Sequence, residues 1–471
     1  FTGQDPDCTC TEMQLMMNEC ACDGAGDTTY TPSNDNEKVV KIFSSNMAGF
    51  AALKADGSLK IWNQWGIPTT TVTNVIDVFY TKTGEATAVL KSDGSVQVWG
   101  EGGKGGTDPG LTSGVVNISS TNNAFAALKS DGTVKAWGDA EQGGGEGCAG
   151  TGWYACKPSD LSNVVSIHSN MEAFAALKND GSITVWGSNG YGGKNGYYTG
   201  SDVVKIYSNA GAFAALRSDG SVSVWGEQNT YGGKISGIAV KTITPENDNK
   251  KVVHIAPGYD LFAALKADGT VQTWGRHQWS ITYTEQTSMT TSIVANGRGF
   301  AGIKSDGSVA AWGDNNYGGC VNGNGESDTK CAPYGLSGLV DIVPSYGMYG
   351  AFAALKSDGT VKAWGETERG GCDSGAGTSD YSCKPSLSNV DNLYTLQNGF
   401  AAVQSDNVLK TWGRFTSVTI SSSSSSSSGS SSSDSSSSGG APYCITCQDG
   451  YDNQDGNACE ACPEGEYSVG G

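Results

Sequence analysis

Apolar and polar positions alternate along most of the chain in one repeated pattern. The segment from Phe125 to Gly138 begins with an apolar run, passes through Lys-Ser-Asp-Gly and returns through a second apolar run to Trp137. It recurs nine times, and in every copy the tryptophan follows twelve residues after a phenylalanine or, once, after Thr87. The nine tryptophans are Trp62, Trp99, Trp137, Trp186, Trp225, Trp274, Trp312, Trp364 and Trp412. A constant internal length between connections of variable length predicts nine β-hairpins.

The turn is predicted at an Asp-Gly dipeptide in eight of the hairpins, and the ninth has Asp406-Asn407 in its place. Asp131-Gly132 is a combination that two-residue hairpin turns favour. Pairing outward from such a turn places Ala126 opposite Trp137, so that Phe125 lies on the other face of the hairpin from Trp137. Both faces stay apolar near the tryptophan, and we therefore expect neighbouring units to cover both of them.

A third apolar run precedes most of the hairpins, as in Val164-Val-Ser-Ile167 and Val203-Val-Lys-Ile206. Each unit is therefore predicted to hold at least three strands. Sheets covered on both faces by their neighbours indicate an all-β, propeller-like ring of about nine short repeats, with an open β superhelical array as the alternative. We expect no helix longer than three turns in this region.

The repeats resemble those of the regulator of chromosome condensation family, whose β-propellers carry an alanine-leucine strand, an Asp-Gly turn and a closing Trp-Gly. The resemblance includes the glycine-rich tail after the tryptophan, as in Trp312-Gly-Asp-Asn-Asn-Tyr-Gly-Gly319, and spans residues 37–413. It implies a propeller fold. The family's nuclear members act in nucleotide exchange on a small GTPase and contact chromatin, and neither role is expected of an acidic, cysteine-rich chain.

Charge and composition limit the classes of partner that the chain is expected to bind. The chain has 29 basic and 48 acidic side chains, a net charge of −19, and 68 glycines in 471 residues. Nucleic acid and anionic lipid need clustered Lys and Arg, so neither is an expected partner. No apolar stretch is long enough to span a bilayer, and membrane insertion is not expected. Because the chain opens at Phe1 without an apolar leader, we expect that any signal peptide has been removed.

Four segments are predicted. Residues 1–36 form an N-terminal disulfide-rich cap and linker, and residues 37–413 form the nine-repeat domain. Residues 414–440 are a serine-rich tether, since 16 of the 18 residues from Ser421 to Ser438 are serine. Residues 441–471 form a cysteine-rich module. The tether cannot bury apolar area, and it is either a flexible spacer or a modified stalk.

The 14 cysteines occur in compact groups, which indicates disulfides and an extracellular location. Three pairs each lie in one polar loop and are predicted to be bonded within it: Cys148 with Cys156, Cys320 with Cys331, and Cys372 with Cys383. The terminal groups, whose connectivity stays open, are Cys8, Cys10, Cys20 and Cys22, and Cys444, Cys447, Cys459 and Cys462.

The last four cysteines have the spacing of a zinc ribbon. They and the following Pro463-Glu-Gly-Glu-Tyr467 also resemble cysteine-rich modules of the growth-factor-receptor and epidermal-growth-factor-like type. An oxidising compartment favours disulfides over zinc. Because the sequence stops where a further module would begin, it is compatible with a fragment of a longer protein.

Residues with catalytic or metal-binding chemistry are sparse. The three histidines, His168, His254 and His277, form no catalytic motif, and no enzyme activity, metal or cofactor is expected. The turn aspartates are expected to shape turns rather than to bind calcium. They are Asp56, Asp93, Asp131, Asp180, Asp219, Asp268, Asp306 and Asp358.

Two further sets of residues bear on sugars. Loop tyrosines can stack on sugars, but we expect them to pack under their own loops: Tyr191, Tyr197, Tyr198, Tyr231 and Tyr317. Glycosylation is predicted at the sequon Asn117-Ile-Ser119 and along the tether, beginning at Ser421, Ser422, Ser423 and Ser424.

These features predict a non-catalytic, glycosylated extracellular protein that builds a surface filament, appendage or coat. Its expected partners are further copies of itself, other extracellular structural proteins and glycans. The layout looks similar to surface proteins of single-celled algae and related protists. The alternative is a secreted propeller that binds carbohydrate or protein ligands through its loops.

Overall fold

The computed structural model is almost entirely β-structure. It describes residues 8–9, 21–22, 39–45, 49–62, 72–146, 153–159, 161–193, 201–227, 231, 242–275, 290–319, 331–333, 335–345, 350–371, 387–396, 399–405, 409–413, 443–444 and 467–468. Helical structure within these ranges is limited to 3-10 turns of three residues. They are η2 (Gly102–Lys104), η3 (Ala140–Gln142), η4 (Asn189–Tyr191), η5 (Asp248–Lys250), η7 (Asn315–Tyr317) and η8 (Thr367–Arg369). The expectation of an all-β fold is confirmed.

Nine units of consecutive antiparallel strands form the described body. The first strands are β3 (Val39–Ser45), β6 (Val75–Tyr80), β9 (Val115–Ser120), β13 (Val164–Ser169), β16 (Val203–Ser208), β20 (Val252–Pro257), β23 (Thr290–Ala295), β26 (Leu339–Pro344) and β29 (Val390–Leu396). The second strands are β4 (Gly49–Lys54), β7 (Ala86–Lys91), β10 (Ala124–Lys129), β14 (Ala173–Lys178), β17 (Ala212–Arg217), β21 (Leu261–Lys266), β24 (Gly299–Lys304), β27 (Ala351–Lys356) and β30 (Gly399–Gln404). The third strands are β5 (Leu59–Trp62), β8 (Val96–Gly100), β11 (Val134–Gly138), β15 (Ile183–Ser188), β18 (Val222–Gly226), β22 (Val271–Gly275), β25 (Val309–Gly313), β28 (Val361–Gly365) and β31 (Leu409–Gly413).

Short strands extend two of these units. β12 (Tyr154–Ala155) pairs with β15, and β19 (Thr242–Ile243) pairs with β18. Outside the body, β1 (Cys8–Thr9) pairs with β2 (Ala21–Cys22), and β32 (Tyr443–Cys444) pairs with β33 (Tyr467–Ser468). The rest of the predicted segments 1–36, 414–440 and 441–471 lies outside the described residues.

The hairpins form where the sequence places them, but the predicted register is wrong by one residue. Phe125 lies opposite Trp137, and Ala126 lies opposite Ala136 rather than Trp137. The phenylalanine and the tryptophan are therefore on the same face of the hairpin, not on opposite faces. Their rings stack with centroids 5.2 Å apart.

The turn explains the difference. The hairpin loop has three residues, Ser130, Asp131 and Gly132, and only Gly132 has positive φ, at 76°. Gly132 N donates to Lys129 O, and Lys129 N donates to Thr133 O, each at 2.9 Å. This is a type I turn followed by a glycine bulge, a common three-residue hairpin loop.

Each junction between units is an apolar layer. Seven described units repeat the stack of phenylalanine on tryptophan, with centroid distances of 5.2–5.6 Å. Around Phe174 and Trp186 the layer holds Leu128 and Val134 from the unit before and Ile167 from the same unit. The core is therefore distributed over the junctions, as in other repeat proteins.

Two kinds of hydrogen bond repeat between units. At all eight junctions the turn glycine accepts from the first backbone N–H of the next unit, as Gly132 O does from Val164 N at 3.0 Å. In addition, the Trp186 indole donates to Gly143 O at 3.0 Å, and the same bond joins Trp137 to Gly105. The acceptor glycines belong to the glycine-rich tail of the preceding unit.

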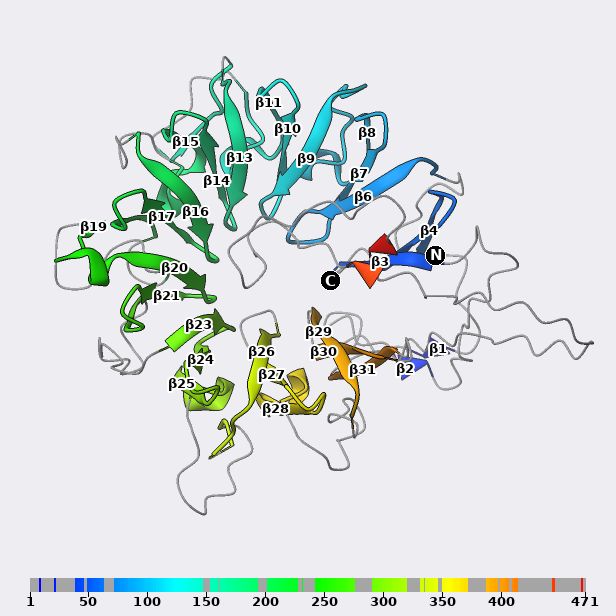
Figure 1. Cartoon of the computed structure of the whole chain (residues 1–471). Coiled ribbons are helices and arrows are strands. Elements are labelled where there is room, and N and C mark those ends of the chain that lie inside the picture. Colours follow the sequence, from blue (N-terminus) through cyan, green and yellow to red (C-terminus); the bar gives the residue numbers. More distant parts are fainter. Residues whose placement is uncertain are drawn as a thin grey trace, which may run out of the picture.

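The units follow one another around an arc that covers most of a circle (Figure 1). The first strands point toward the middle of this arc, as β13, β16 and β20 show (Figure 1). The loops between first and second strands therefore lie on the inside of the arc, and the Asp-Gly turns lie on the outside. This propeller-like arrangement creates two candidate surfaces, one along each side.

Candidate functional site

The inner rim consists of the loops that join first and second strands, with the tail residues that touch them. These loops are residues 81–85, 121–123, 170–172, 209–211, 258–260 and 296–298. Backbone hydrogen bonds connect them from unit to unit. Asn122 N donates to Met171 O at 2.7 Å, Met171 N donates to Ala210 O at 3.0 Å, and Ala210 N donates to Tyr259 O at 3.2 Å. The inner rim is thus one continuous belt.

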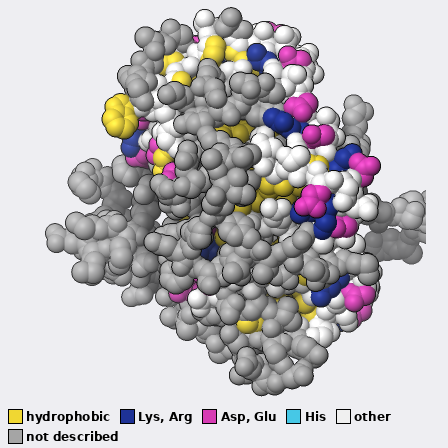
Figure 2. All heavy atoms as spheres, turned by 90° about the vertical axis from the view of Figure 1, so that its left-hand side faces the viewer, with side chains coloured by type: hydrophobic (Ala, Val, Ile, Leu, Met, Phe, Trp, Pro, Cys, Tyr) yellow, Lys and Arg dark blue, Asp and Glu magenta, His cyan; other side chains and the backbone are white. Residues whose placement is uncertain are grey.

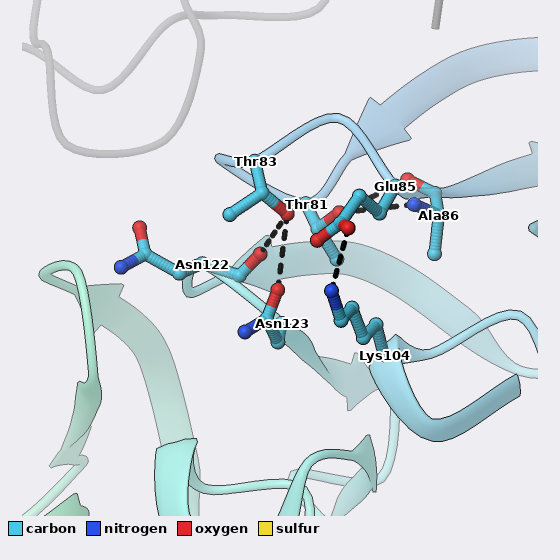
Figure 3. A network of polar contacts seen from close by, with 7 residues as sticks. All are labelled: Thr81, Thr83, Glu85, Ala86, Lys104, Asn122 and Asn123. Carbon is cyan, nitrogen blue, oxygen red and sulfur yellow. Dashed lines mark hydrogen bonds and ion pairs between the residues drawn. The ribbon is translucent and has the colours of Figure 1, made fainter. Parts of the chain in front are cut away.

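Polar side chains reinforce the belt at its start (Figure 3). The Thr83 hydroxyl donates to Asn122 O at 2.7 Å and lies 3.0 Å from the side-chain amide of Asn123. Lys104, which ends η2, forms an ion pair with Glu85. The hydrogen bond from Lys104 holds the pKa of Glu85 below its usual value. The Thr83 contacts join the second unit to the third, and the Lys104–Glu85 pair fixes the tail of the second unit on its own loop.

Three tyrosines lie next to one another further along the inner rim. The ring centroids of Tyr191 and Tyr231 are 6.2 Å apart, and those of Tyr231 and Tyr259 are 6.0 Å apart. Burial raises the pKa of Tyr259 to about 12. Tyr191 and Tyr231 pack against the apolar layers, and Tyr317 is buried, so these three side chains lie against the body of the protein. Tyr197 and Tyr198 lie outside the described residues.

Two acidic side chains of the rim are in unusual surroundings. Asp260, 1% exposed, pairs with Arg298 of the next unit at 3.1 Å. A charge buried to this degree needs such a partner. Glu172 is half-buried, and desolvation raises its pKa, helped by the nearby charges of Asp139 and Glu141.

The hydrogen bonds of the inner rim connect neighbouring loops. Among the described residues, the rim brings no group of catalytic side chains together. His168 Nε2 lies 3.1 Å from the Ser166 hydroxyl within one strand, and His254 meets the edge of the Tyr207 ring at 5.9 Å. His277 lies outside the described residues. No group of three or more His, Cys, Asp or Glu able to hold a metal ion occurs among the described residues.

The first strands carry a feature that the sequence reading missed. In β13 the register shifts between Val164 and Ser166, so that Val165 is an extra residue in a β-bulge. Val165 is exposed while Val164 is buried. The same bulge position is 50–56% exposed in six units, which carry Ile76, Val116, Val165, Val204, Val253 and Val340. The sequence signal for this bulge is the second valine of the repeated Val-Val-x-Ile runs.

The outer stripe combines these bulge residues with the Asp-Gly turns. Each turn hydrogen-bonds to the first residue of the next unit, so it lies beside that unit's bulge residue. A stripe unit is therefore a basic residue, an aspartate and a bulge residue, as in Lys129, Asp131 and Val165. The other seven are Lys54, Asp56 and Ile76; Lys91, Asp93 and Val116; Lys178, Asp180 and Val204; Arg217, Asp219 and Val253; Lys266, Asp268 and Thr291; Lys304, Asp306 and Val340; and Lys356, Asp358 and Asp391.

The turn aspartates act as turn residues, which matches the expectation. Asp131 Oδ1 accepts from Thr133 N at 2.9 Å and from its hydroxyl at 2.6 Å. The hydroxyl hydrogen bond is the main cause that lowers the pKa of Asp131. The pKa values of Asp268 and Asp358 fall to about 2 for the same main reason. These carboxylates stay charged at any ordinary pH.

The predicted modification sites are only partly described. Asn117 is exposed in β9, next to Val116 of the outer stripe, and its Oδ1 accepts from Ile118 N at 2.7 Å. Cys156 and Cys331 are disulfide-bonded, and their partners lie outside the described residues, so the predicted pairings stay predictions. Cys8 lies opposite Cys22 in the β1–β2 ladder. Ser421–Ser424 and the remaining cysteines, apart from the backbone of Cys444, lie outside the described residues.

Comparisons with known proteins bear on the fold. No protein-family model matches the chain, and no curated protein matches it. Among solved structures, the chain is similar to the WD40 ectodomain of the receptor kinase ACR4 from Arabidopsis thaliana, with 19% identity, a TM-score of 0.35, and coverage of 61% of this chain and 93% of that one. It is also similar to Prp20p, the RCC1 of Saccharomyces cerevisiae, with 14% identity, a TM-score of 0.36, and coverage of 73% of this chain and 83% of that one.

The likeness to these solved structures concerns the fold alone. No helix in the described ranges has the length and apolar character needed to cross a membrane.

Proposed function

We propose that this chain is a non-catalytic, extracellular building block that assembles with further copies of itself into a filament, appendage or coat. The observation that carries the proposal is the hydrogen bond from the turn glycine to the next unit, which repeats at all eight junctions. A scaffold fastened in this way presents the same surface groups at regular steps over a long distance. Such a surface suits contact with another extended protein better than the enclosure of a small substrate.

Charge and cysteines support the same proposal. A net charge of −19 keeps such a protein from clumping without specificity. The disulfide-bonded Cys156 and Cys331 fit an oxidising compartment. Glycans at Asn117 and on the serine-rich segment would add a hydrated layer.

The experiment is a concentration series of the full-length chain secreted from a eukaryotic host. Sedimentation velocity and negative-stain microscopy should show larger species as concentration rises, and intact-glycopeptide mass spectrometry should find sugar on Asn117 or the tether. Protein that stays monomeric at millimolar concentration, with no polymeric form, would contradict the proposal.

The tyrosines of the inner rim favour a second candidate, a secreted protein that binds carbohydrate through its loops. Tyr191, Tyr231 and Tyr259 are partly exposed rings with polar groups beside them, and sugar sites combine these features. A glycan array probed with the wild type and a Tyr231→Ala variant separates the candidates. Binding that this variant loses, by a protein that does not assemble, would select the second one.

A further inference from the structure

We propose that the outer stripe is the surface through which two copies of this chain pair face to face, an inference that rests on the proposed function and names its interface. The stripe runs over eight successive units and presents one bulge residue and one charge pair in each. Figure 2 shows basic and acidic side chains beside one another at successive levels toward the right-hand edge of that view.

The apolar part of the stripe is unusual for a free surface. Single exposed apolar residues are normal in proteins and need no explanation. Here, however, six of the eight bulge positions hold isoleucine or valine, and each side chain is at least 50% exposed. Threonine and aspartate occupy the two remaining positions, Thr291 and Asp391. The bulge holds each of these side chains outward in the same way, since it is the extra residue of the ladder.

Charge distinguishes the stripe from the rest of the molecule. Its eight lysines and arginines face eight turn aspartates and Asp391, which leaves a net charge of −1 out of −19 for the whole chain. Two copies therefore approach through these faces without the repulsion that the other surfaces produce. In addition, the stripe alternates basic and acidic groups along its length, and some pair within one turn, as Lys356 and Asp358 do at 3.0 Å.

The regular spacing of the stripe units indicates which partner binds the outer stripe. A partner that engages the whole stripe must present apolar and charged groups at the same intervals, along the same curved path. A second copy meets this requirement when it is turned by a two-fold axis, because a self-complementary patch then places basic groups opposite acidic ones. Eight units of three side chains also supply about as many residues as one side of a standard interface, roughly 20–30.

The test compares single substitutions in the full-length chain. Val204→Asp places a charge in the middle of the stripe, and the natural Asp391 shows that the bulge position accepts an aspartate. Trp153→Asp is the matched control, because it replaces an exposed apolar side chain, 84% exposed, that is not part of the stripe. Val204→Thr, which copies the natural Thr291, reduces the apolar contact without adding charge. Circular dichroism checks that all variants fold.

The readout is the self-association constant from sedimentation equilibrium. A two-fold interface contains each substitution twice, so we expect Val204→Asp to weaken association about 100-fold, Val204→Thr to weaken it several-fold, and Trp153→Asp to leave it unchanged. If the chain assembles and Val204→Asp assembles equally well, the stripe is not the interface, although the proposed function stands. Equal weakening by both aspartate variants would assign the effect to net charge and also overturn the inference. A wild type that never associates overturns the interface and the proposed function together.

Discussion

The indole hydrogen bond that joins consecutive units can be measured by one substitution. Trp186→Phe removes the Nε1–H that donates to Gly143 O at 3.0 Å, while a phenyl ring still stacks on Phe174. Trp186 is fully buried, so water does not replace the lost donor. We expect this variant to loosen the junction between the third and fourth units.

A second tryptophan provides the control. Trp274 is almost as buried and stacks on Phe262 with the same centroid distance of 5.2 Å, but its Nε1 has no hydrogen-bond partner in the described region. Trp274→Phe therefore loses the same packing without losing a hydrogen bond. A buried carbonyl left without its donor costs about 1–3 kcal/mol. The difference between the two variants should fall in that range.

The assay is native-state hydrogen exchange followed by mass spectrometry, because a repeat array need not unfold as one unit. Amides of β14 and β15 should exchange about 5- to 150-fold faster in Trp186→Phe than in the wild type, beyond any change that Trp274→Phe causes in β21 and β22. Equal effects of the two substitutions would refute the view that this hydrogen bond holds neighbouring units together.

Three further predictions concern stability and one concerns covalent structure. Glu172→Gln should stabilise the protein at pH 7 by less than about 1 kcal/mol, because solvent screens the charge of this partly buried carboxylate. Because the folded pKa of Glu172 is raised, the wild type gains stability as pH falls through that value, and a pH series of melting temperatures should show this gain only in the wild type. Gly132→Ala should cost about 1–2 kcal/mol because φ is 76°, whereas Gly103→Ala, with open space around it, should be near neutral in urea unfolding. The depressed pKa values of Asp268 and Asp358 predict that their contribution is complete above pH 3.8 and is lost only as pH falls toward about 2, which acid titration by circular dichroism checks. Peptide mapping without reductant should find the three predicted intraloop disulfides, and free thiols at those positions would contradict them.

The sequence predicted the hairpins well because their signals are local and repeated. The Asp-Gly turns and the three apolar runs of each unit depend on neighbouring residues, and nine copies average out the exceptions. The register failed because Asp-Gly favours a two-residue turn, whereas here the loop also includes Ser130. The phenylalanine and the tryptophan are twelve residues apart, an even number. Two such residues lie opposite each other only when the loop between the strands has an odd number of residues, as the three-residue loop here does.

The candidate surfaces were harder to predict because they depend on how units meet. The inner-rim belt consists of backbone hydrogen bonds between loops about 40 to 50 residues apart, such as Asn122 to Met171, and backbone groups have no sequence signature. The outer stripe depends on a bulge, which shifts Val165 out of the simple in-and-out alternation of a strand. Alternation alone cannot reveal such an extra residue.

The hydrogen bonds from turn glycine to next strand have a consequence for how the chain folds during synthesis. Each unit contacts mainly the unit made just before it, so the hydrogen bonds between units join segments within about 50 residues of each other and need no part of the chain made much later. A ribosome adds about 5–20 residues per second. A new unit therefore emerges every few seconds. This is ample time for a hairpin to form and to pack against the turn of the preceding unit, as Val164 does against Gly132. Growth of the array can keep pace with translation, and the apolar face exposed at any moment is that of one unit only.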